Sequence, residues 1–183
     1  MIWTGIVVVP CPRVDGIRLR RARYDDGGEL GRIEFATWST TVSPAPRPGP
    51  DDGFFDGRRH PDDVLVAETD HRVVGYSILQ QEFSVPSHHH VLQLTGLAVS
   101  PAYQRSGIGR QLVHGAVRDA GLAGARKVTL RVLASNTAAQ ILYRATGFVV
   151  EGVLRAEFLL DGRYVDDVLM ARAPTPPAIE RAG

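Results

Sequence analysis

Two hydrophobic periods alternate along the second half of the chain, and they predict strands and helices in turn. Residues 92–99 form a largely apolar run, and residues 127–133 alternate apolar with polar positions, so we expect a strand in each segment. From Ile108 onward, apolar positions recur with the 3.6-residue period of an amphipathic helix. Because two strands bridged by a helix normally lie parallel with a right-handed crossover, residues 92–133 predict a β-α-β unit.

The first half carries strands and a helix separated by a long irregular segment. Residues 17–24 predict a strand, and Asp25 begins a helix. Residues 64–68 and 72–79 predict two further strands joined as a hairpin. Residues 43–57 contain four prolines and three glycines, a composition that removes backbone donors and favours turns, so we expect a long mobile loop there.

A further helix and a closing hairpin complete the pattern. Ser135 or Asn136 is suited to cap a helix that stops near Gly147. After it, residues 149–160 and 163–171 flank an Asp-Gly pair, which is a strong signal for a two-residue hairpin turn. The order of elements predicts an α/β fold that ends in a β-hairpin.

Length and composition fit one domain of this kind. The chain has 183 residues, of which 44% are apolar and 22% are charged, as is typical of globular proteins. We divide it into an N-terminal extension (residues 1–16), one α/β domain (residues 17–172) and a disordered tail (residues 173–183).

Charge and cysteine content exclude several classes of partner. The 21 basic and 20 acidic residues nearly cancel, which gives no electrostatic reason to expect nucleic acid binding. Cys11 is the single cysteine, so it cannot form an internal disulfide or a cysteine-based zinc site. No apolar stretch approaches the ~20 residues that a membrane helix needs. We therefore expect a cytoplasmic protein with no membrane partner.

The segment of residues 104–110 is the first candidate for chemistry. It lies between a predicted strand end and a predicted helix start, where unpaired backbone N–H groups and the helix dipole favour an anion. Gly107 and Gly109 would allow close backbone approach, and Arg105 and Arg110 could bind a pyrophosphate. Taken alone, the same glycines equally fit an ordinary turn at a helix start.

Two motifs then carry a family resemblance. Residues 97–112, LAVSPAYQRSGIGRQL, resemble the acetyl-CoA signature of the GCN5-related N-acetyltransferases, whose core pattern [QR]-x-x-G-x-[GA] is met by Gln104, Gly107 and Gly109. Residues 136–148 match N-x-x-A-x-x-L-Y-x-x-x-G-F and resemble the helix that follows in that family. Both motifs occur in the expected order, and the resemblance covers about residues 17–172.

The resemblance implies a mixed, splayed central sheet flanked by helices, in which the strand at 92–99 parts from the strand at 127–133. Acetyl-CoA would bind in the resulting cleft as the acyl donor, with its pyrophosphate on residues 105–110 and its pantetheine arm against the backbone of Leu97 and Val99. The full set of expected cofactor-binding residues is Leu97, Ala98, Val99, Gln104, Arg105, Ser106, Gly107, Ile108, Gly109, Arg110, Asn136, Ala139 and Tyr143.

Tyr143 is the expected catalytic residue. It lies seven positions after Asn136, about two helical turns, so the two side chains share one helix face. The resemblance assigns the Tyr143 hydroxyl to protonating the departing CoA thiolate and Asn136 to contacting the cofactor. A backbone N–H, that of Val99, would polarise the thioester oxygen. The alternative is that Tyr143 packs in the core with its hydroxyl bonded to the backbone.

A general base is less clearly indicated. Relatives often carry a Glu on the strand equivalent to 92–99, but this chain has Gln93, which could only orient a water. Glu82, Glu157 and the histidines of residues 88–90 are the other candidates. Adjacent histidines on an extended chain point to opposite faces and no second ligand cluster is present, so we expect no metal.

The terminal hairpin suggests how an acceptor could be recognised. If Leu160 pairs with Arg163, then Glu157 lies opposite Asp166 on the face that also carries Arg155. Arg155 could simply neutralise the two carboxylates, or the acidic pair could attract a cationic amine.

These observations predict an acetyl-CoA-dependent N-acetyltransferase in which a primary amine attacks the thioester directly in a ternary complex. The acceptor would be an amino acid, a small-molecule amine or antibiotic, or a protein N-terminus, selected in part by residues 43–57. The alternatives are a non-catalytic acyl-CoA-binding regulatory module and an enzyme that transfers a longer acyl group. The resemblance also suggests a homodimer formed through the C-terminal strands.

Overall fold

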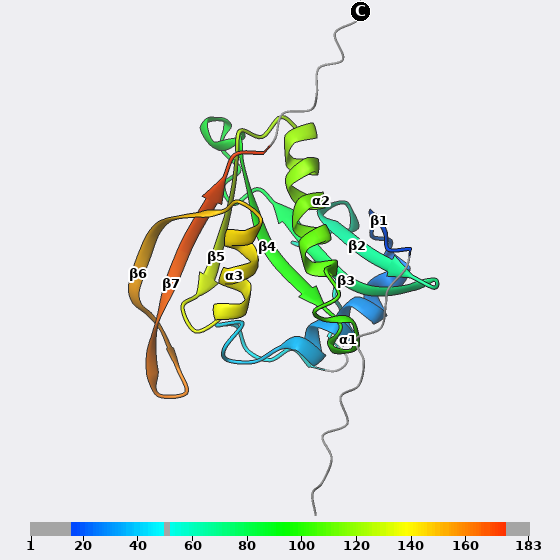
Figure 1. The fold of residues 1–183 in the computed structure, drawn as a ribbon, viewed down its shortest axis with the longest axis horizontal. Coiled ribbons are helices and arrows are strands. Elements are labelled where there is room, and N and C mark those ends of the chain that lie inside the picture. The colour runs from blue at the N-terminus through cyan, green and yellow to red at the C-terminus, as the bar shows by residue number, and fades with distance from the viewer. Residues whose placement is uncertain (1–15, 50–51, 175–183) are drawn as a thin grey trace, which may run out of the picture.

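A seven-stranded mixed sheet forms the centre of the computed structural model, which describes residues 16–49 and 52–174 (Figure 1). The strand order is β1-β2-β3-β4-β5-β7-β6. The strands are β1 (Arg18–Arg21), β2 (Val64–Thr69), β3 (Arg72–Gln80), β4 (Val91–Val99), β5 (Lys127–Leu133), β6 (Val149–Leu160) and β7 (Arg163–Arg172). The helices are α1 (Gly27–Thr37), α2 (Ile108–Leu122) and α3 (Thr137–Ala145). This is the α/β fold with a closing hairpin that the sequence predicts.

Helices cover both faces of the sheet, because the strands carry apolar side chains on each face. Leu30 and Ile33 of α1 pack with Val64 and Val66 of β2 on one face. On the other face, the residue between them, Leu65, packs with the start of α2. On the same face, the second half of α2 and the inner side of α3 form one buried cluster with residues of β5 and β7. The sheet therefore separates an α1 face from an α2–α3 face.

The two central strands are parallel over only part of their length. Val91 to Leu94 of β4 pair with Lys127 to Leu130 of β5, and no pairing follows. Beyond that point β4 continues alongside β3 and β5 continues alongside β7. The expected β-α-β unit and the expected splay between these two strands are both confirmed.

The terminal hairpin confirms the predicted turn but corrects the predicted register. Leu160 pairs with Arg163, as expected. The register then shifts between Leu154 and Phe158, where Ala156 has a φ of 52°. Because of this bulge, Glu157 does not lie opposite Asp166, and the predicted facing acidic pair is wrong.

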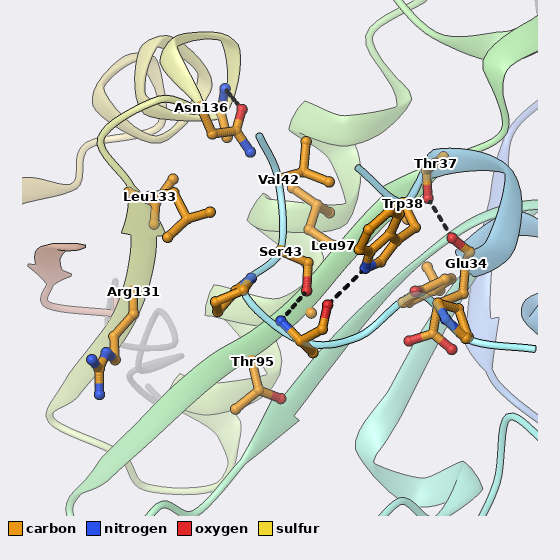
Figure 2. Close-up of a pocket in the computed structure, with 18 of the residues that line it drawn as sticks. Glu34, Thr37, Trp38, Val42, Ser43, Thr95, Leu97, Arg131, Leu133 and Asn136 are labelled. Atoms are coloured by element: carbon orange, nitrogen blue, oxygen red, sulfur yellow. Dashed lines mark hydrogen bonds between the residues drawn. The ribbon is translucent and has the colours of Figure 1, made fainter. Parts of the chain in front are cut away.

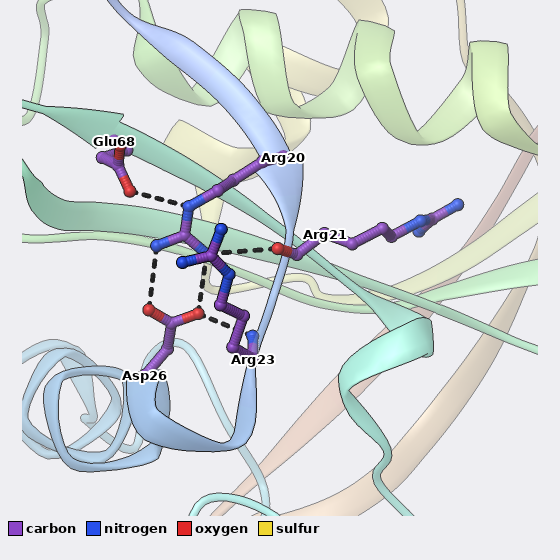
Figure 3. A network of polar contacts seen from close by, with 5 residues as sticks. All are labelled: Arg20, Arg21, Arg23, Asp26 and Glu68. Atoms are coloured by element: carbon purple, nitrogen blue, oxygen red, sulfur yellow. Dashed lines mark hydrogen bonds and ion pairs between the residues drawn. The ribbon is translucent and has the colours of Figure 1, made fainter.

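An ion-pair network joins the first strand to the start of α1 (Figure 3). Arg20 donates from Nη1 and Nη2 to both carboxylate oxygens of Asp26, at 2.7 and 2.9 Å, and from Nε to Glu68 at 2.7 Å. The strand itself is shorter than the predicted residues 17–24, because Asp26 also accepts the Arg23 N–H and draws the chain into a 3-10 turn.

The termini are only partly described. Most of the predicted extension (residues 1–16) and of the predicted tail (residues 173–183) lies outside the described residues, so both assignments stay predictions. Within the described ranges, no helix is long and apolar enough to cross a membrane.

Candidate functional site

A cavity of about 770 Å³ opens where β4 and β5 part. One wall is β4 from Leu94 to Val99, and the other is formed by the end of β5 and by α3. Figure 2 shows Arg131, Leu133 and Asn136 following one another along the second wall, across from β4. Because the splay interrupts the sheet, this cavity is lined by residues from both faces.

The segment between α1 and β2 covers the cavity on the α1 face of the sheet. We call residues 38–49 and 52–60 the crossing loop; it passes between the two walls in Figure 2. Thr40 donates to Asp161 of the terminal hairpin at 2.6 Å, and the Ser135 hydroxyl donates to the Thr41 carbonyl at 3.2 Å. Phe54 is buried at the far end of the loop. These contacts attach a loop without regular structure to three separate parts of the domain.

Seven of the expected cofactor-binding residues line the cavity, and the other six follow directly along the chain. The seven are Leu97, Ala98, Val99, Gln104, Asn136, Ala139 and Tyr143. Residues 105–110 form the turn into α2, beside the cavity rather than in its lining.

The turn into α2 depends on left-handed backbone. Gly107 is the N-cap of α2, with a φ of 89°, and Arg105 has a φ of 63°. The Ser106 hydroxyl donates to the Tyr103 carbonyl at 2.5 Å, which closes the turn. Among the described residues, no side chain caps α2, so the first N–H groups of the helix are not taken by a capping side chain there and suit an anionic ligand.

Two of the expected cofactor ligands are occupied by backbone contacts. Gln104 donates from Nε2 to the Val99 carbonyl at 3.0 Å. The Asn136 Oδ1 accepts the Ala139 N–H at 3.1 Å, which makes Asn136 the N-cap of α3. Both side chains therefore hold the ends of the two diverging walls in place.

Tyr143 reaches the cavity from the α2–α3 face. It is 8% exposed and its ring packs edge-on against Phe148, with 5.8 Å between centroids. Among the residues described, none makes a hydrogen bond to its hydroxyl. Burial raises the pKa of this phenol to about 12, so it stays protonated at neutral pH and can donate.

The α1 face contributes charged residues that the sequence analysis did not select. Glu34 and Arg59 form an ion pair of 3.1 Å, and Arg59 lies over the Phe54 ring. Arg131 donates from Nε to Asp167 at 2.5 Å. In the sequence, Arg131 is simply a polar position in an alternating strand, so the pattern predicts its face and gives no sign of its role. Asp167 gives a weak signal, as an acid directly before the apolar residues 168–171.

The four candidate acceptor or base residues do not line the cavity. Glu82 is exposed after the end of β3, and Gln93 lies in the paired part of β4. Glu157 contacts Arg131 at 3.1 Å instead of Asp166. Asp166 accepts from Arg155 at 2.6 Å and from the Ala156 N–H.

The histidine segment lies at the opposite end of β4 from the turn into α2. His88 packs edge-on against Phe83, with 4.9 Å between ring centroids. Across residues 16–49 and 52–174 there is no group of three His, Cys, Asp or Glu side chains suited to a metal ion. A reaction without metal stays a prediction.

Two curated relatives share the sequence of this region. The uncharacterized N-acetyltransferase Rv2669 of Mycobacterium tuberculosis is 31% identical over 109 residues, which cover 60% of this chain and 65% of that protein. The [ribosomal protein bS18]-alanine N-acetyltransferase of Escherichia coli K12 is 39% identical over 80 residues, or 43% of this chain and 53% of that protein. The match thus spans less than two thirds of either relative.

Solved structures share the fold over nearly their whole length. The protein smu.2055 from Streptococcus mutans UA159 has a TM-score of 0.76 and 29% identity, and the match covers 86% of this chain and 99% of that one. The acetyltransferase-like protein yncA from Salmonella typhimurium, solved with its cofactor acetyl-CoA, has a TM-score of 0.74 and 21% identity, covering 92% of this chain and 100% of that one.

A family model also matches residues 30–148, which include β4, α2, β5, α3 and the crossing loop. Of the residues that line the cavity, Phe158 and Asp167 of the terminal hairpin lie outside this match. Since that match covers more than half of the sequence, the chain belongs to the acetyltransferase (GNAT) family.

Proposed function

We propose that this protein is an acetyl-CoA-dependent N-acetyltransferase that acts on a primary amine in a ternary complex. The single observation that carries the proposal is the placement of Tyr143, a buried residue at the cavity whose protonated hydroxyl stays accessible and has no partner among the described residues. A hydroxyl in this position is left to bond to water or to a ligand in the cavity. A structural tyrosine packed in the core would normally bond to the backbone.

The two faces of the sheet suggest how two substrates would meet. The turn at Gly107, the β4 backbone at Leu97 and Val99, and α3 would hold acetyl-CoA, which supplies the acetyl thioester. The acceptor would enter from the α1 face, beneath the crossing loop. Holding the amine against the thioester in one cavity would supply much of the acceleration.

Residues of the chain, together with water, would then transfer the protons of the reaction. The amine nitrogen bonds to the acetyl carbon as the carbon–sulfur bond breaks, and the amide and the free thiol leave. In this proposal the Tyr143 hydroxyl gives its proton to the departing sulfur, and the Val99 N–H stabilises the carbonyl oxygen. In this proposal the proton lost by the amine passes to water, and the Tyr143 phenolate takes a proton back from water to complete the cycle. Glu82, Gln93, Glu157 and Asp166 all lie outside the cavity lining.

The acceptor remains a primary amine: an amino acid, a small-molecule amine or antibiotic, or a protein N-terminus. Support comes from the family, whose relatives include an enzyme named for the alanine of a ribosomal protein. The crossing loop covers the α1 face of the cavity, so we infer that it helps to select the acceptor.

A free-thiol release assay tests the proposal. The full chain is given acetyl-CoA with amino acids, aminoglycosides, polyamines and short peptides, alongside Tyr143→Phe. We expect release that depends on one class of amine and falls by about 10²-fold or more in Tyr143→Phe, as for removal of a general acid. If calorimetry shows acetyl-CoA binding while no amine gives release above buffer, the catalytic proposal fails and a non-catalytic acyl-CoA-binding module takes its place.

A further inference from the structure

Arg131 occupies a particular place in the divided sheet. It is the first β5 residue after Leu130, the last residue that pairs with β4. Its side chain lies on the α1 face, because Leu130 and Val132 on either side of it belong to the core under α2 and α3. It also lines the cavity. A guanidinium therefore stands at the apex of the splay, on the face from which the acceptor would enter.

The guanidinium is held in place but not saturated. Its Nε donates to Asp167 at 2.5 Å, and Asp167 has a side chain only 3% exposed. Its Nη2 donates to Glu157 at 3.1 Å, and Glu157 is 37% exposed at the rim. Within the described part of the chain, nothing accepts a hydrogen bond from Nη1. The contact with Asp167 is thus buried and fixed, and the contact with Glu157 is exposed and replaceable. The N–H groups of Nη1 have no acceptor among the described residues.

The carboxylates along the same cavity are already engaged. Asp167 is bound to Arg131, and Glu34 is bound to Arg59. Asp56 accepts the N–H groups of Arg58 and Arg59, and Asp52 accepts the N–H group of Gly49 at 2.6 Å. Arg59 also lines the cavity, but it donates from Nη1 to both Glu34 and the Phe54 carbonyl and lies over the Phe54 ring, whereas Arg131 is the lining arginine on β5, where that strand parts from β4. The group that can still bind a ligand where the two strands part is therefore a positively charged donor, Nη1 of Arg131.

We propose that Arg131 is a specificity-determining residue that binds a carboxylate of the acceptor, and hence that the acceptor is an α-amino acid or a close analogue. Planar guanidinium groups bind carboxylates through two parallel N–H bonds, which Nη1 and Nη2 present once the exposed Glu157 contact gives way. Asp167 fixes the orientation of the Arg131 guanidinium. This inference rests on the proposed acetyltransferase function and narrows its substrate class.

Matched acceptors test the role of the carboxylate. Thiol release is measured for a panel of L-amino acids and for their carboxamides, with spermidine and an alanine-initiated peptide alongside. For the wild-type chain we expect kcat/KM to be about 10- to 100-fold higher for the acid than for its carboxamide, the range expected for a charge-assisted hydrogen bond. Equal use of acid and carboxamide, or preference for spermidine or the peptide, would overturn the proposal.

Variants separate recognition from stability. Arg131→Gln should bring the acid-to-carboxamide ratio close to one, mainly through the KM of the acid. Because that change leaves Asp167 buried without its partner, the double variant Arg131→Gln/Asp167→Asn is measured with it, and melting temperatures are recorded for both. Arg155→Gln is the matched control, since Arg155 is exposed, pairs with Asp166 and does not line the cavity. A ratio that survives both Arg131 variants contradicts the proposal.

Failure of the acetyltransferase proposal gives a different experimental result from failure of the Arg131 proposal. If no amine releases thiol, the acetyltransferase proposal fails, and calorimetric binding of amino acid and carboxamide to the CoA-loaded protein still decides the role of Arg131. Tighter binding of the acid that is lost in Arg131→Gln supports it, and equal binding of the two overturns it.

Discussion

The Asn136 side chain accepts the backbone N–H of Ala139 at 3.1 Å, and this bond places the start of α3 at the edge of the cavity. The asparagine that the family motif would assign to the cofactor thus has a local task, because its Oδ1 satisfies one of the free N–H groups of the first turn. Its Nδ2 has no partner among the described residues, so cap and ligand contact are compatible through different atoms.

Substitutions at Asn136 separate those two tasks. Asn136→Ser keeps an oxygen that can cap, while Asn136→Ala removes it, so only the alanine variant should lose about 1 kcal/mol of unfolding free energy. If the amide also contacts the cofactor, both variants raise the KM for acetyl-CoA. Chemical denaturation and steady-state kinetics measure the two effects. An unchanged KM in the stable serine variant would leave Asn136 with the capping task alone.

Gly107 is required by backbone conformation rather than by space. Its φ is 89°, and a Cβ built there would meet nothing within 4 Å. Gly107→Ala should therefore cost about 1 kcal/mol of stability and weaken acetyl-CoA binding, because an L-residue resists this left-handed conformation. Gly107→Asn should recover part of both losses, since asparagine tolerates that region. Thermal unfolding and calorimetry provide the measurements. Equal behaviour of the two variants would contradict the conformational explanation.

The sequence predicted the sheet and helices well because their signals are local. The change of period at Ile108 and the Asp-Gly turn after Leu160 both depend on neighbouring residues, and both elements formed as expected. The splay came instead from the family resemblance, because no periodicity in residues 92–99 or 127–133 says where two parallel strands stop pairing.

The errors and omissions depend on contacts between distant residues. Counting back from the turn placed Glu157 opposite Asp166, but the pairing breaks between Leu154 and Phe158, and Glu157 falls inside that break. The position of Arg131 at the apex of the splay could not be predicted, since its partner Asp167 lies 36 positions away in the chain. Patterns along the chain indicate which face a residue occupies, whereas the pairing between strands decides what it meets.

The pKa of Tyr143 gives a pH-dependent prediction. Burial raises the pKa of its hydroxyl to about 12, so most of the phenol keeps its proton at pH 10. If this hydroxyl is the acid, kcat should show no decline near pH 10, where an ordinary tyrosine ionises. The kcat profile of the wild type is measured from pH 6 to 10.5 with Tyr143→Phe as the comparison. A fall near pH 10 that is absent in Tyr143→Phe would mean that the phenol ionises earlier than its burial implies.

The network of Arg20, Asp26 and Glu68 predicts a loss of stability in acid (Figure 3). The Arg20 guanidinium and the Arg23 N–H hold the pKa of Asp26 below its ordinary value, although burial opposes them. The folded chain therefore keeps this carboxylate ionised at a pH where the unfolded chain has begun to take up a proton. Its contribution is complete above the unfolded value of about 3.9 and is lost as the pH falls through the lower folded value.

Removing the Asp26 charge should make that contribution disappear at neutral pH. Asp26→Asn leaves an amide oxygen for the Arg23 N–H but breaks a largely buried ion pair, so we expect about 1–3 kcal/mol lower unfolding free energy at pH 7. The difference from the wild type should shrink toward pH 3. Glu29→Gln is the control, because the exposed pair between Glu29 and Arg32 on α1 should be worth less than 1 kcal/mol. Denaturation curves from pH 3 to 7 decide the matter: a constant difference between Asp26→Asn and the wild type would show that the network stabilises the fold through packing and not through charge.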